Sequence, residues 1–298
     1  MSSRRTRARI WSTRGGTPTR RGTPCAGGLA AAGTRVEDVR GVIVTHAHTD
    51  HYGLAGRIRE ASGAWIALHE LDVPLLAAAE CDPAGRLAGL LERVGAPPRL
   101  ADRLVSRART RRRPEDLPHP DRILQDRERL AVPGFDLRVL WTPGHSPGHI
   151  CLWEDRRRLL LSGDHVLPEF AVGLHEPAPG REDPLGGYLS SLDRLAGLDP
   201  AEVLPAHEHR FTGLDARLAA LRAHHRRRLA QVAGALRIGA VHGWDIAAAV
   251  TWHRPFEELR GFALRAALQD TLACLGLLDA RGLVRRETGP PERWYPRA

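Results

Sequence analysis

The amino-acid sequence predicts an α+β protein in two unequal domains. Short apolar strands and helical segments alternate over residues 34–69, a two-residue alternation of apolar and polar side chains begins at Arg122, and helical stretches with a hairpin close the chain. At 298 residues the chain exceeds one ordinary small domain. Its 42% hydrophobic and 27% charged residues are typical of a globular protein.

The larger domain is predicted over 34–213 and begins abruptly after Gly33. Its first elements are a capped helical turn, a buried strand, a helix and a second short strand (34–40, 42–44, 54–61 and 64–68). Gly63 is the expected turn between that helix and the second strand.

Two helical stretches follow, at 73–93 and 98–109, separated by the sequence GAPP. They end in the charged run RTRRRPED. We interpret about 73–113 as a helical insertion that could overhang a site. A solvated helical hairpin is the alternative.

From Arg122 the alternating pattern between glycine and proline turns predicts a β-meander. A helix over 184–197 and a strand at 202–204 close the larger domain. Residues 214–298 form the smaller one. Its predicted elements are three helices and a hairpin around a Gly-Pro-Pro turn (214–235, 241–252, 256–278 and 282–296), an order typical of a winged-helix unit.

The net charge of +9 comes from the N-terminal segment. Residues 1–36 hold eight arginines and no acid, whereas residues 37–298 hold 36 arginines and all 35 acidic residues. All 44 basic residues are arginine, which indicates the coding bias of a GC-rich genome more than a phosphate-binding surface. The charge is therefore weak evidence for a nucleic-acid partner.

The spacing of the cysteines and the short length of the apolar runs indicate in which cellular compartment the protein resides. Cys25, Cys81, Cys151 and Cys274 have no CxxC spacing, which favours small buried side chains in a reducing environment over a disulfide framework. No apolar run of 18 residues exists, and no apolar stretch follows the basic N-terminus as it would in a secretory signal. We expect a cytoplasmic protein without a membrane partner.

The segment GVIVTHAHTDHYG places three histidines and an aspartate within six positions, directly after a predicted strand. His46 and His48 are two residues apart, so they point to the same side of an extended chain. Asp50 and His51 follow where the chain turns into the next helix, where they can reach a second ion. Imidazole nitrogens and carboxylate oxygens suit zinc, iron or manganese.

Three further candidate ligands each follow a predicted strand. They are His145 in LWTPGHSPGH, Asp164 in LLLSGDHV and His207 in VLPAHEH. Seven nitrogen and oxygen ligands from four strand ends are what a site for two metal ions requires. Asp164 is the natural bridge between the ions because a carboxylate has two oxygens.

The ordered motifs HxHxDH, GH, GD and a last histidine after a strand resemble those of the metallo-β-lactamase superfamily, within it the glyoxalase II-like hydrolases. The resemblance covers about 34–213, and the tail resembles the winged-helix extension of the lactamase-β-like branch. It implies a four-layer αβ/βα sandwich and two divalent ions, zinc before iron or manganese. It also implies two ligand groups, His46, His48 and His145 for the first ion and Asp50, His51 and His207 for the second, with Asp164 and a water bridging both.

The remaining histidines are expected to act less directly. His149 and His165 neighbour ligands and are predicted to hydrogen-bond rather than coordinate. His175, in the loop GLHEP, stays open as a residue near the site. Tyr188 either lines a substrate pocket or packs its helix onto the sheet. The other histidines considered are predicted to lie at the surface: His69, His119, His209, His224 and His225.

The implied reaction is hydrolysis. Two ions about 4 Å apart lower the pKa of a shared water toward neutrality, and the bridging hydroxide attacks a carbonyl or phosphoryl centre. The sequence has no GxSxG elbow, so no protein nucleophile is expected. Asp50 and Asp164 are the predicted catalytic carboxylates, Asp50 to orient and ligate and Asp164 to bridge.

Three functions compete. The first is a hydrolase of a thioester, ester or lactone, glyoxalase II-like or acyl-thioesterase-like, with a small-molecule substrate. The second is an endoribonuclease or phosphodiesterase, and the third a non-enzymatic winged-helix protein that binds nucleic acid. The near-zero charge beyond residue 36 favours the first, because RNA binding requires a clustered basic face.

Two further possibilities concern related chemistry and assembly. β-Lactamase activity is disfavoured because Asp164 fits the bridging carboxylate of the hydrolase branch and no signal peptide is present. Redox chemistry stays open, because persulfide dioxygenase relatives use a similar ligand set with one iron. The winged-helix unit is expected to shape a pocket or to form a homodimer contact.

Residues 1–33 are rich in Arg, Thr, Gly and Pro and show no strand or helix periodicity. Superfamily members normally begin with β-hairpins whose last strand ends near Asp-Thr-Gly. We predict that residues 1 to about 28 are an out-of-frame or mis-started translation in place of these strands, and that the segment is disordered. A mitochondrial-type transit peptide is the alternative, but it would precede the hairpins rather than replace them.

Overall fold

The computed structural model of the chain describes residues 23–81, 83–109, 117–174 and 183–297. The chain divides into two compact units that interleave along the sequence. The first unit takes 1–80, 114–172 and 191–217, and the second unit takes 81–113, 173–190 and 218–298. Most of the segment predicted to be aberrant, residues 1–22, lies outside the described residues.

The first unit contains two β-sheets. The smaller sheet has three parallel strands in the order β1-β2-β3 (Gly41–Ile43, Trp65–His69 and Arg122–Leu124). The larger sheet has five strands in the order β4-β5-β6-β7-β8 (Arg129–Val132, Phe135–Trp141, Ile150–Glu154, Leu159–Gly163 and Glu202–Pro205). Strands β4 to β7 form the predicted antiparallel meander, and β8 runs parallel to β7.

The prediction that the meander begins at Arg122 is wrong by one strand, because β3 belongs to the smaller sheet. The residue before it explains the difference. The backbone N–H of Asp121 donates to the carbonyl of Ile66 at 2.8 Å, and the Asp121 carboxylate accepts the N–H of Ile66 at 2.9 Å. These bonds align the chain with β2 before β3 starts.

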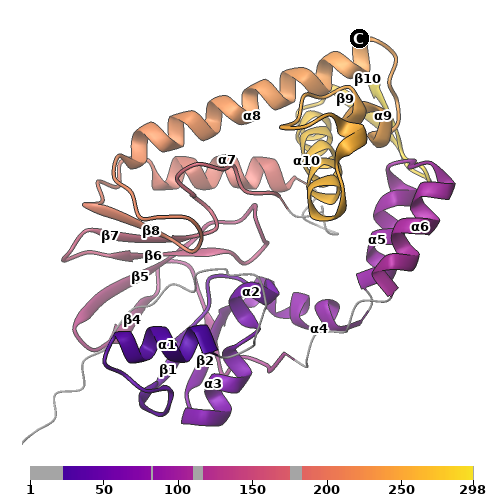
Figure 1. Cartoon of the computed structure of the whole chain (residues 1–298). Coiled ribbons are helices and arrows are strands. Elements are labelled where there is room, and N and C mark those ends of the chain that lie inside the picture. The colour runs from indigo at the N-terminus through magenta and orange to yellow at the C-terminus, as the bar shows by residue number, and fades with distance from the viewer. Residues whose placement is uncertain (1–22, 82, 110–116, 175–182, 298) are drawn as a thin grey trace, which may run out of the picture. The chain divides into compact units, whose positions relative to one another are not determined.

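The two sheets pack face to face around an apolar core (Figure 1). The core residues are Ala67, Leu124, Leu130, Leu137, Val139, Ile150, Leu152 and Leu161. On the outer face of the smaller sheet a second cluster joins Ile66 and Leu68 of β2 to Tyr52 of α2 (Thr49–Tyr52) and Ala55 of α3 (Ala55–Ser62).

The last residues of α7 (Pro184–Leu195) belong to the first unit and are tied to the elements of the larger sheet. The hydroxyl of Ser191 donates to the carbonyl of Pro143 at 2.9 Å, and Arg194 pairs with Asp126 at 2.7 Å. The layers of the first unit are therefore helix, sheet, sheet and helix. The predicted mixed α/β fold is confirmed.

One helix was not expected from the sequence. Helix α1 (Thr23–Ala31) falls in the segment without periodicity and is followed by the 3-10 helix η1 (Val36–Asp38). The sequence TPCAGGLAA has no polar face, so no amphipathic pattern could reveal it. Its alanines, which have the highest intrinsic helix propensity, still favour the helical backbone.

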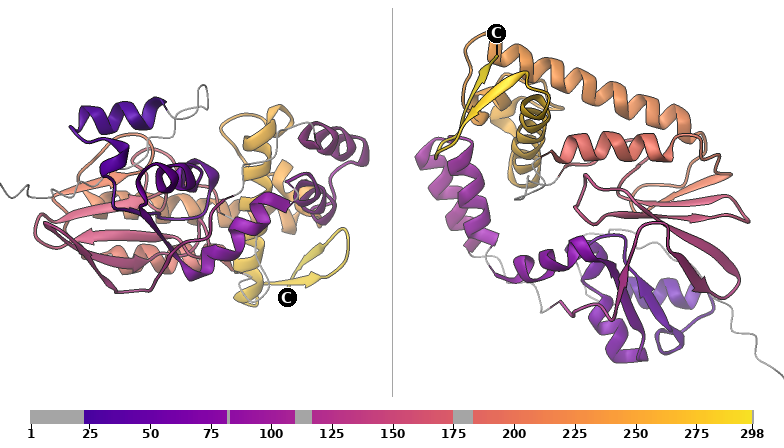
Figure 2. Two further views of the ribbon diagram at one scale, coloured as in Figure 1. Left: turned by 90° about the horizontal axis from the view of Figure 1, so that it is seen from below. Right: turned by 180° about the vertical axis from the view of Figure 1, so that it is seen from behind.

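The second unit holds helices from both the middle and the end of the chain. Its helices are α5, α6, α9 and α10 (Pro83–Arg93, Pro98–Arg109, Gly243–Ala248 and Gly261–Ala280), together with most of α8 (Leu214–Arg237). An antiparallel hairpin of β9 (Val284–Glu287) and β10 (Arg293–Pro296) follows, with β9 against α10 (Figure 2). Three helices and a hairpin stand as predicted, and their assignment to the winged-helix class stays a prediction.

Helix α4 (Val73–Cys81) and helices α5 and α6 replace the two predicted stretches of the insertion. The end of α5 packs with the C-terminal elements. Arg93 forms an ion pair with Glu292 at 2.9 Å, and the N–H of Trp244 donates to the carbonyl of Val94 at 2.7 Å. The C-terminal helix predicted from residue 256 instead opens with a 3-10 turn, η3 (Phe256–Glu258), before α10 begins.

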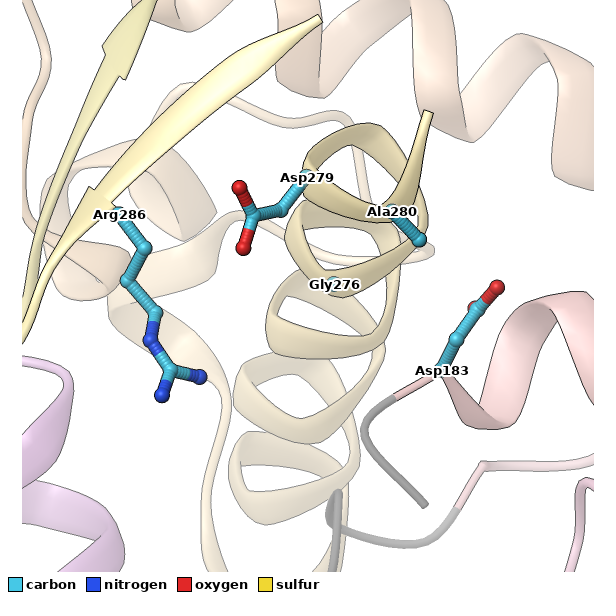
Figure 3. A pocket seen from close by; sticks show the side chains of 5 residues that line it. All are labelled: Asp183, Gly276, Asp279, Ala280 and Arg286. Carbon is cyan, nitrogen blue, oxygen red and sulfur yellow. The ribbon is translucent and has the colours of Figure 1, made fainter. Parts of the chain in front are cut away.

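Helix α10 is the one helix of the described residues that is long and apolar enough to cross a membrane. Because 56% of its apolar window is buried within the protein, a core helix accounts equally well for this composition. A pocket of about 230 Å³ lies beside it in the second unit and is lined by Asp183, Gly276, Asp279, Ala280 and Arg286 (Figure 3). None of the seven predicted ligands lines this pocket.

Candidate metal centre

All seven predicted ligands lie in the first unit, and the structure brings them together. Each follows a strand end, as the motifs predicted. His46 and His48 follow β1, and Asp50 and His51 lie in α2, whose first turn begins directly after His48. The other three follow β5, β7 and β8 and are His145, Asp164 and His207. The strand ends therefore gather residues from four distant parts of the sequence into one cluster.

Three histidines form the first group of the cluster. Nε2 of His46 lies 3.0 Å from Nδ1 of His48 and 3.2 Å from Nε2 of His145. The other ring nitrogen of His46, Nδ1, is 3.1 Å from the hydroxyl of Thr45. That contact occupies Nδ1 and leaves Nε2 directed at its two neighbours.

Asp50, His51 and His207 form the second group. Nε2 of His207 is 3.3 Å from Nε2 of His51 and 3.4 Å from Oδ2 of Asp50. His51 lies 3.5 Å from the same carboxylate oxygen. The side chain of Asp50 is 52% exposed and that of His207 26%, while that of His51 is 4% exposed, so the group is open to solvent on one side.

Asp164 lies between the two groups. Its Oδ2 is 3.5 Å from Nε2 of His145 in the first group, 3.4 Å from His51 and 3.3 Å from His207 in the second. Its Oδ1 is buried and has no hydrogen-bond partner among the described residues. A buried carboxylate oxygen without a donor is costly, and a bound cation would satisfy it.

The donor set fits divalent metal ions. Four donors at 2.0–2.1 Å from a tetrahedral ion lie about 3.3 Å from one another, close to the observed nitrogen separations. There are too few protons for every pair of these neighbouring imidazole nitrogens to share one, whereas a metal ion can bind several nitrogens at once. His46, His48 and His145 can hold one ion, and Asp50, His51 and His207 a second, with Asp164 reaching both.

The protonation states agree with this fit. Burial, and then His51 and His48, lower the pKa of His46 well below its ordinary value, while burial and His145 lower the pKa of His48 to about 3. Both rings are therefore neutral and have lone pairs to donate. Burial opposes ionisation of Asp164, but hydrogen bonds from His207 and His51 outweigh it and lower the pKa of this carboxyl.

His207 differs from His46 and His48 in its protonation. Hydrogen bonds to Asp164 and then to Asp50 raise the pKa of His207 to about 10. A metal ion at the second group would therefore displace a proton from this ring, since a histidine ligand must be neutral.

His149 supports the cluster by hydrogen bonding, as the sequence predicted. Its Nε2 accepts the backbone N–H of Asp164 at 3.1 Å, and its Nδ1 lies 2.9 Å from the hydroxyl of Thr142. Gly163 makes this contact possible. Its φ is +53°, and a Cβ there would lie 2.6 Å from Nε2 of His149. His165, also predicted as a supporting residue, is fully buried with its ring 5.7 Å from that of His149.

Asp72 is a residue that the sequence did not indicate. It ends the 3-10 helix η2 (Glu70–Asp72), is fully buried and accepts hydrogen bonds from both loops that carry the first group. No motif or spacing relates Asp72 to the ligands, because its partners are backbone groups far away in the chain. An acid shortly after a strand, two residues beyond Glu70, was the one available signal.

Two histidines predicted to lie at the surface are buried, and that prediction is wrong for them. His69 is 3% exposed because its ring stacks on Trp141 with centroids 5.8 Å apart. His225 is 4% exposed because it packs against Tyr188 at 5.1 Å. Tyr188 is itself fully buried, which favours its packing role. His119 and His209 are exposed as predicted, His224 is half-buried, and His175 lies outside the described residues.

Comparison with known proteins agrees with the geometry. The sequence profile of the metallo-beta-lactamase superfamily matches residues 4–207. The structure is similar to that of a metallo-beta-lactamase family protein from Thermus thermophilus, with a TM-score of 0.76 and 33% identity over 96% of this chain and 89% of that one. It is also similar to a beta-lactamase domain protein from Burkholderia ambifaria, with a TM-score of 0.73 and 28% identity over 87% of this chain and 75% of the other.

A curated relative adds a description of activity. A probable metallo-hydrolase of Bacillus subtilis (strain 168) is 29% identical over 198 residues, which are 63% of this chain and 60% of that protein. Three other curated relatives are matched over 37% to 59% of their own length. The chain thus spans only part of these relatives.

Proposed function

The chain belongs to the metallo-beta-lactamase superfamily, and from this premise we propose that it is a two-metal hydrolase that cleaves a thioester, an ester or a lactone. Metallo-hydrolase character follows from the family and the ligand cluster. The second metal ion and the class of substrate are the proposal.

The position of Asp164 carries the proposal of two ions. One oxygen of this carboxylate lies within 3.5 Å of His145 in the first group and of His51 and His207 in the second. A single ion cannot bind all seven ligands, whereas two ions that share one carboxylate would each have few enough protein ligands to bind water as well. Zinc is the proposed metal, because buried neutral imidazoles dominate the set.

Divalent ions held in this way lower the pKa of water toward neutrality and polarise the carbonyl oxygen of a substrate. The protein's own part is to hold the ligands. His46 and His48 keep neutral rings for the first position, His145 completes that group, and Asp164 supplies negative charge between the positions. Asp50, half exposed beside His207, ligates and orients water on the solvent side.

The outer face of the hairpin supports a small-molecule substrate over a nucleic acid. On that face Arg293 lies 3.9 Å from the carboxylate of Glu287, and Arg285 lies over the ring of Tyr295 at 4.8 Å. These guanidinium groups already have partners within the hairpin. A phosphate backbone would therefore have to compete with contacts that the chain makes itself.

The test combines metal analysis with a substrate panel. The purified chain is assayed for zinc, iron and manganese and then offered a thioester, an ester, a lactone and a fluorescent RNA, each with and without chelator. We expect two ions per chain and chelator-sensitive cleavage of at least one of the first three compounds. A metal content well under one ion per chain would refute the metal centre. A content of about one ion per chain would refute the second metal ion. Cleavage of the RNA alone would refute the proposed class of substrate.

A further inference from the structure

We propose that Asp72 is a positioning residue that sets the geometry of the first ligand group by joining the two loops on which its histidines lie. This inference rests on the proposed metal-binding function. It concerns a residue that lies on neither loop and whose carboxylate accepts hydrogen bonds from residues beside the ligands.

The contacts of Asp72 are short and buried. Its Oδ2 accepts the backbone N–H of Ala47 at 2.8 Å and the hydroxyl of Ser146 at 2.8 Å. Its Oδ1 accepts the backbone N–H of Gly148 at 2.6 Å. The residue has no exposed surface, so solvent does not compete for these bonds.

The donors lie directly beside the ligands in the sequence. Ala47 separates His46 from His48, and Ser146 follows His145. A bond to Ala47 therefore constrains the backbone on both sides of the first two ligands, while a bond to Ser146 constrains the third. One carboxylate thus ties the two loops together directly beside the ligands, whose nitrogens lie 3.0 and 3.2 Å apart.

The loop is built closely around this carboxylate. A Cβ added to Gly148 would lie 2.6 Å from the backbone nitrogen of Asp72 and 2.9 Å from its Oδ1. No side chain fits there without displacing Asp72. The bond from the Trp141 indole to the carbonyl of Pro147 at 2.9 Å holds only the second loop. The backbone N–H of Ile150 donates to the carbonyl of Thr45 at 2.9 Å and joins the two segments only where the loops meet their strands. The Asp72 side chain, in contrast, accepts from both loops.

Chemistry explains why a carboxylate stands here. Burial of an ionised carboxylate is unfavourable unless donors replace water, and three donors do so. Each oxygen already faces a backbone N–H, so an amide NH₂ group in place of either oxygen would meet a donor. The residue must therefore be an acceptor at both oxygens.

The variant Asp72→Asn tests this requirement without changing the size of the side chain. If the amide oxygen takes the place of Oδ2, the NH₂ group faces the N–H of Gly148. If it takes the place of Oδ1, the NH₂ group faces the N–H of Ala47. Either orientation sets two donors against each other, so one of the two loops must move.

Glu154 offers a matched control. It is also fully buried and also accepts two backbone N–H groups, from Asp136 at 3.1 Å and from Arg157 at 2.5 Å. It lies at the far end of β6 from the ligand loop, about 13 Å along the strand. Glu154→Gln disturbs a buried carboxylate of the same unit without touching the metal loops.

The experiment measures zinc affinity by competition with a chromophoric chelator, the absorption spectrum after substitution with Co²⁺, and the melting temperature. For Asp72→Asn we expect the affinity for the tighter ion to fall about 10- to 100-fold and the Co²⁺ bands to shift. For Glu154→Gln we expect a lower melting temperature with unchanged zinc affinity and spectrum. Ser146→Ala, which removes one donor and keeps Asp72, is the milder variant should Asp72→Asn fail to fold, with a few-fold loss of affinity.

Each outcome decides between the two proposals. Zinc binding by wild type together with unchanged affinity and Co²⁺ bands in Asp72→Asn overturns the role of Asp72 alone. Equal effects of Glu154→Gln reduce that role to general stability and overturn it as well. Absence of zinc binding by wild type refutes the proposed function, and the role of Asp72 with it.

Discussion

The two ligand groups differ in how deeply their side chains are buried and in the contacts that support them. In the first, His46 is fully buried and His145 is 7% exposed, and the loops that carry them share the carboxylate of Asp72. In the second, His51 is 4% exposed, but Asp50 and His207 are 52% and 26% exposed. The protein alone therefore holds the first group in place, while the second is open to water. A hydrolase needs both, one fixed position and one that substrate can reach.

Loss of Asp164 has the largest expected effect, because this residue belongs to both sides of the comparison. Asp164→Ala removes the one carboxylate within 3.5 Å of histidines from both groups. We expect hydrolysis to fall by more than about 100-fold, the upper end of what loss of an outer hydrogen-bonding partner costs. Metal content should fall by at least one ion per chain. Full hydrolysis by Asp164→Ala would remove the bridge from the proposal.

The sequence revealed the ligands because metal chemistry limits the choice of residues. His46, His145 and Asp164 each follow a strand end, and only a few side chains can coordinate an ion there. Periodicity likewise predicted most helices and strands. Both signals are local, and a reader of the sequence needs no knowledge of tertiary contacts to use them.

The features that escaped depend on contacts between distant residues or on segments without a pattern. Asp72 accepts from a backbone group 25 residues away and from another 76 residues away, and no residue type at those positions announces this. His69 is buried by Trp141 from another strand. Helix α1 has an apolar, uniform sequence, so no face could be identified from it.

The next prediction compares one ligand of each group. His145→Ala removes a buried ring from the preorganised group, whereas His207→Ala removes a partly exposed ring from the open one. We expect His145→Ala to lose both ions on dialysis, because it removes a ligand of the first ion and the second group, with Asp50 and His207 exposed, holds its ion less tightly. We expect His207→Ala to retain about one ion. Zinc per chain after dialysis measures this, and equal losses in the two variants would break the comparison.

Stepwise removal of metal sharpens the same contrast without a substitution. An exposed group gains less from preorganisation, so we expect the second ion to leave at a lower chelator concentration than the first. Metal per chain and hydrolysis are followed over the same titration. Activity should disappear when the ion of the second, more exposed group is removed, while about one ion per chain remains bound. Loss of both ions in a single step would show that the groups are equally tight.

The smallest expected effect comes from the support of the bridging residue. Thr142→Val keeps the shape of the side chain but removes the hydroxyl that lies 2.9 Å from Nδ1 of His149, the ring whose other nitrogen accepts the N–H of Asp164. Leaving one buried ring nitrogen without its partner should lower the free energy of unfolding by about 1 kcal/mol. Chemical denaturation of the metal-free chain measures this. Because the support is part of the protein and not of the ion, we expect the same loss with and without zinc, and a loss confined to the zinc-loaded form would instead make the ion responsible for the order of this loop.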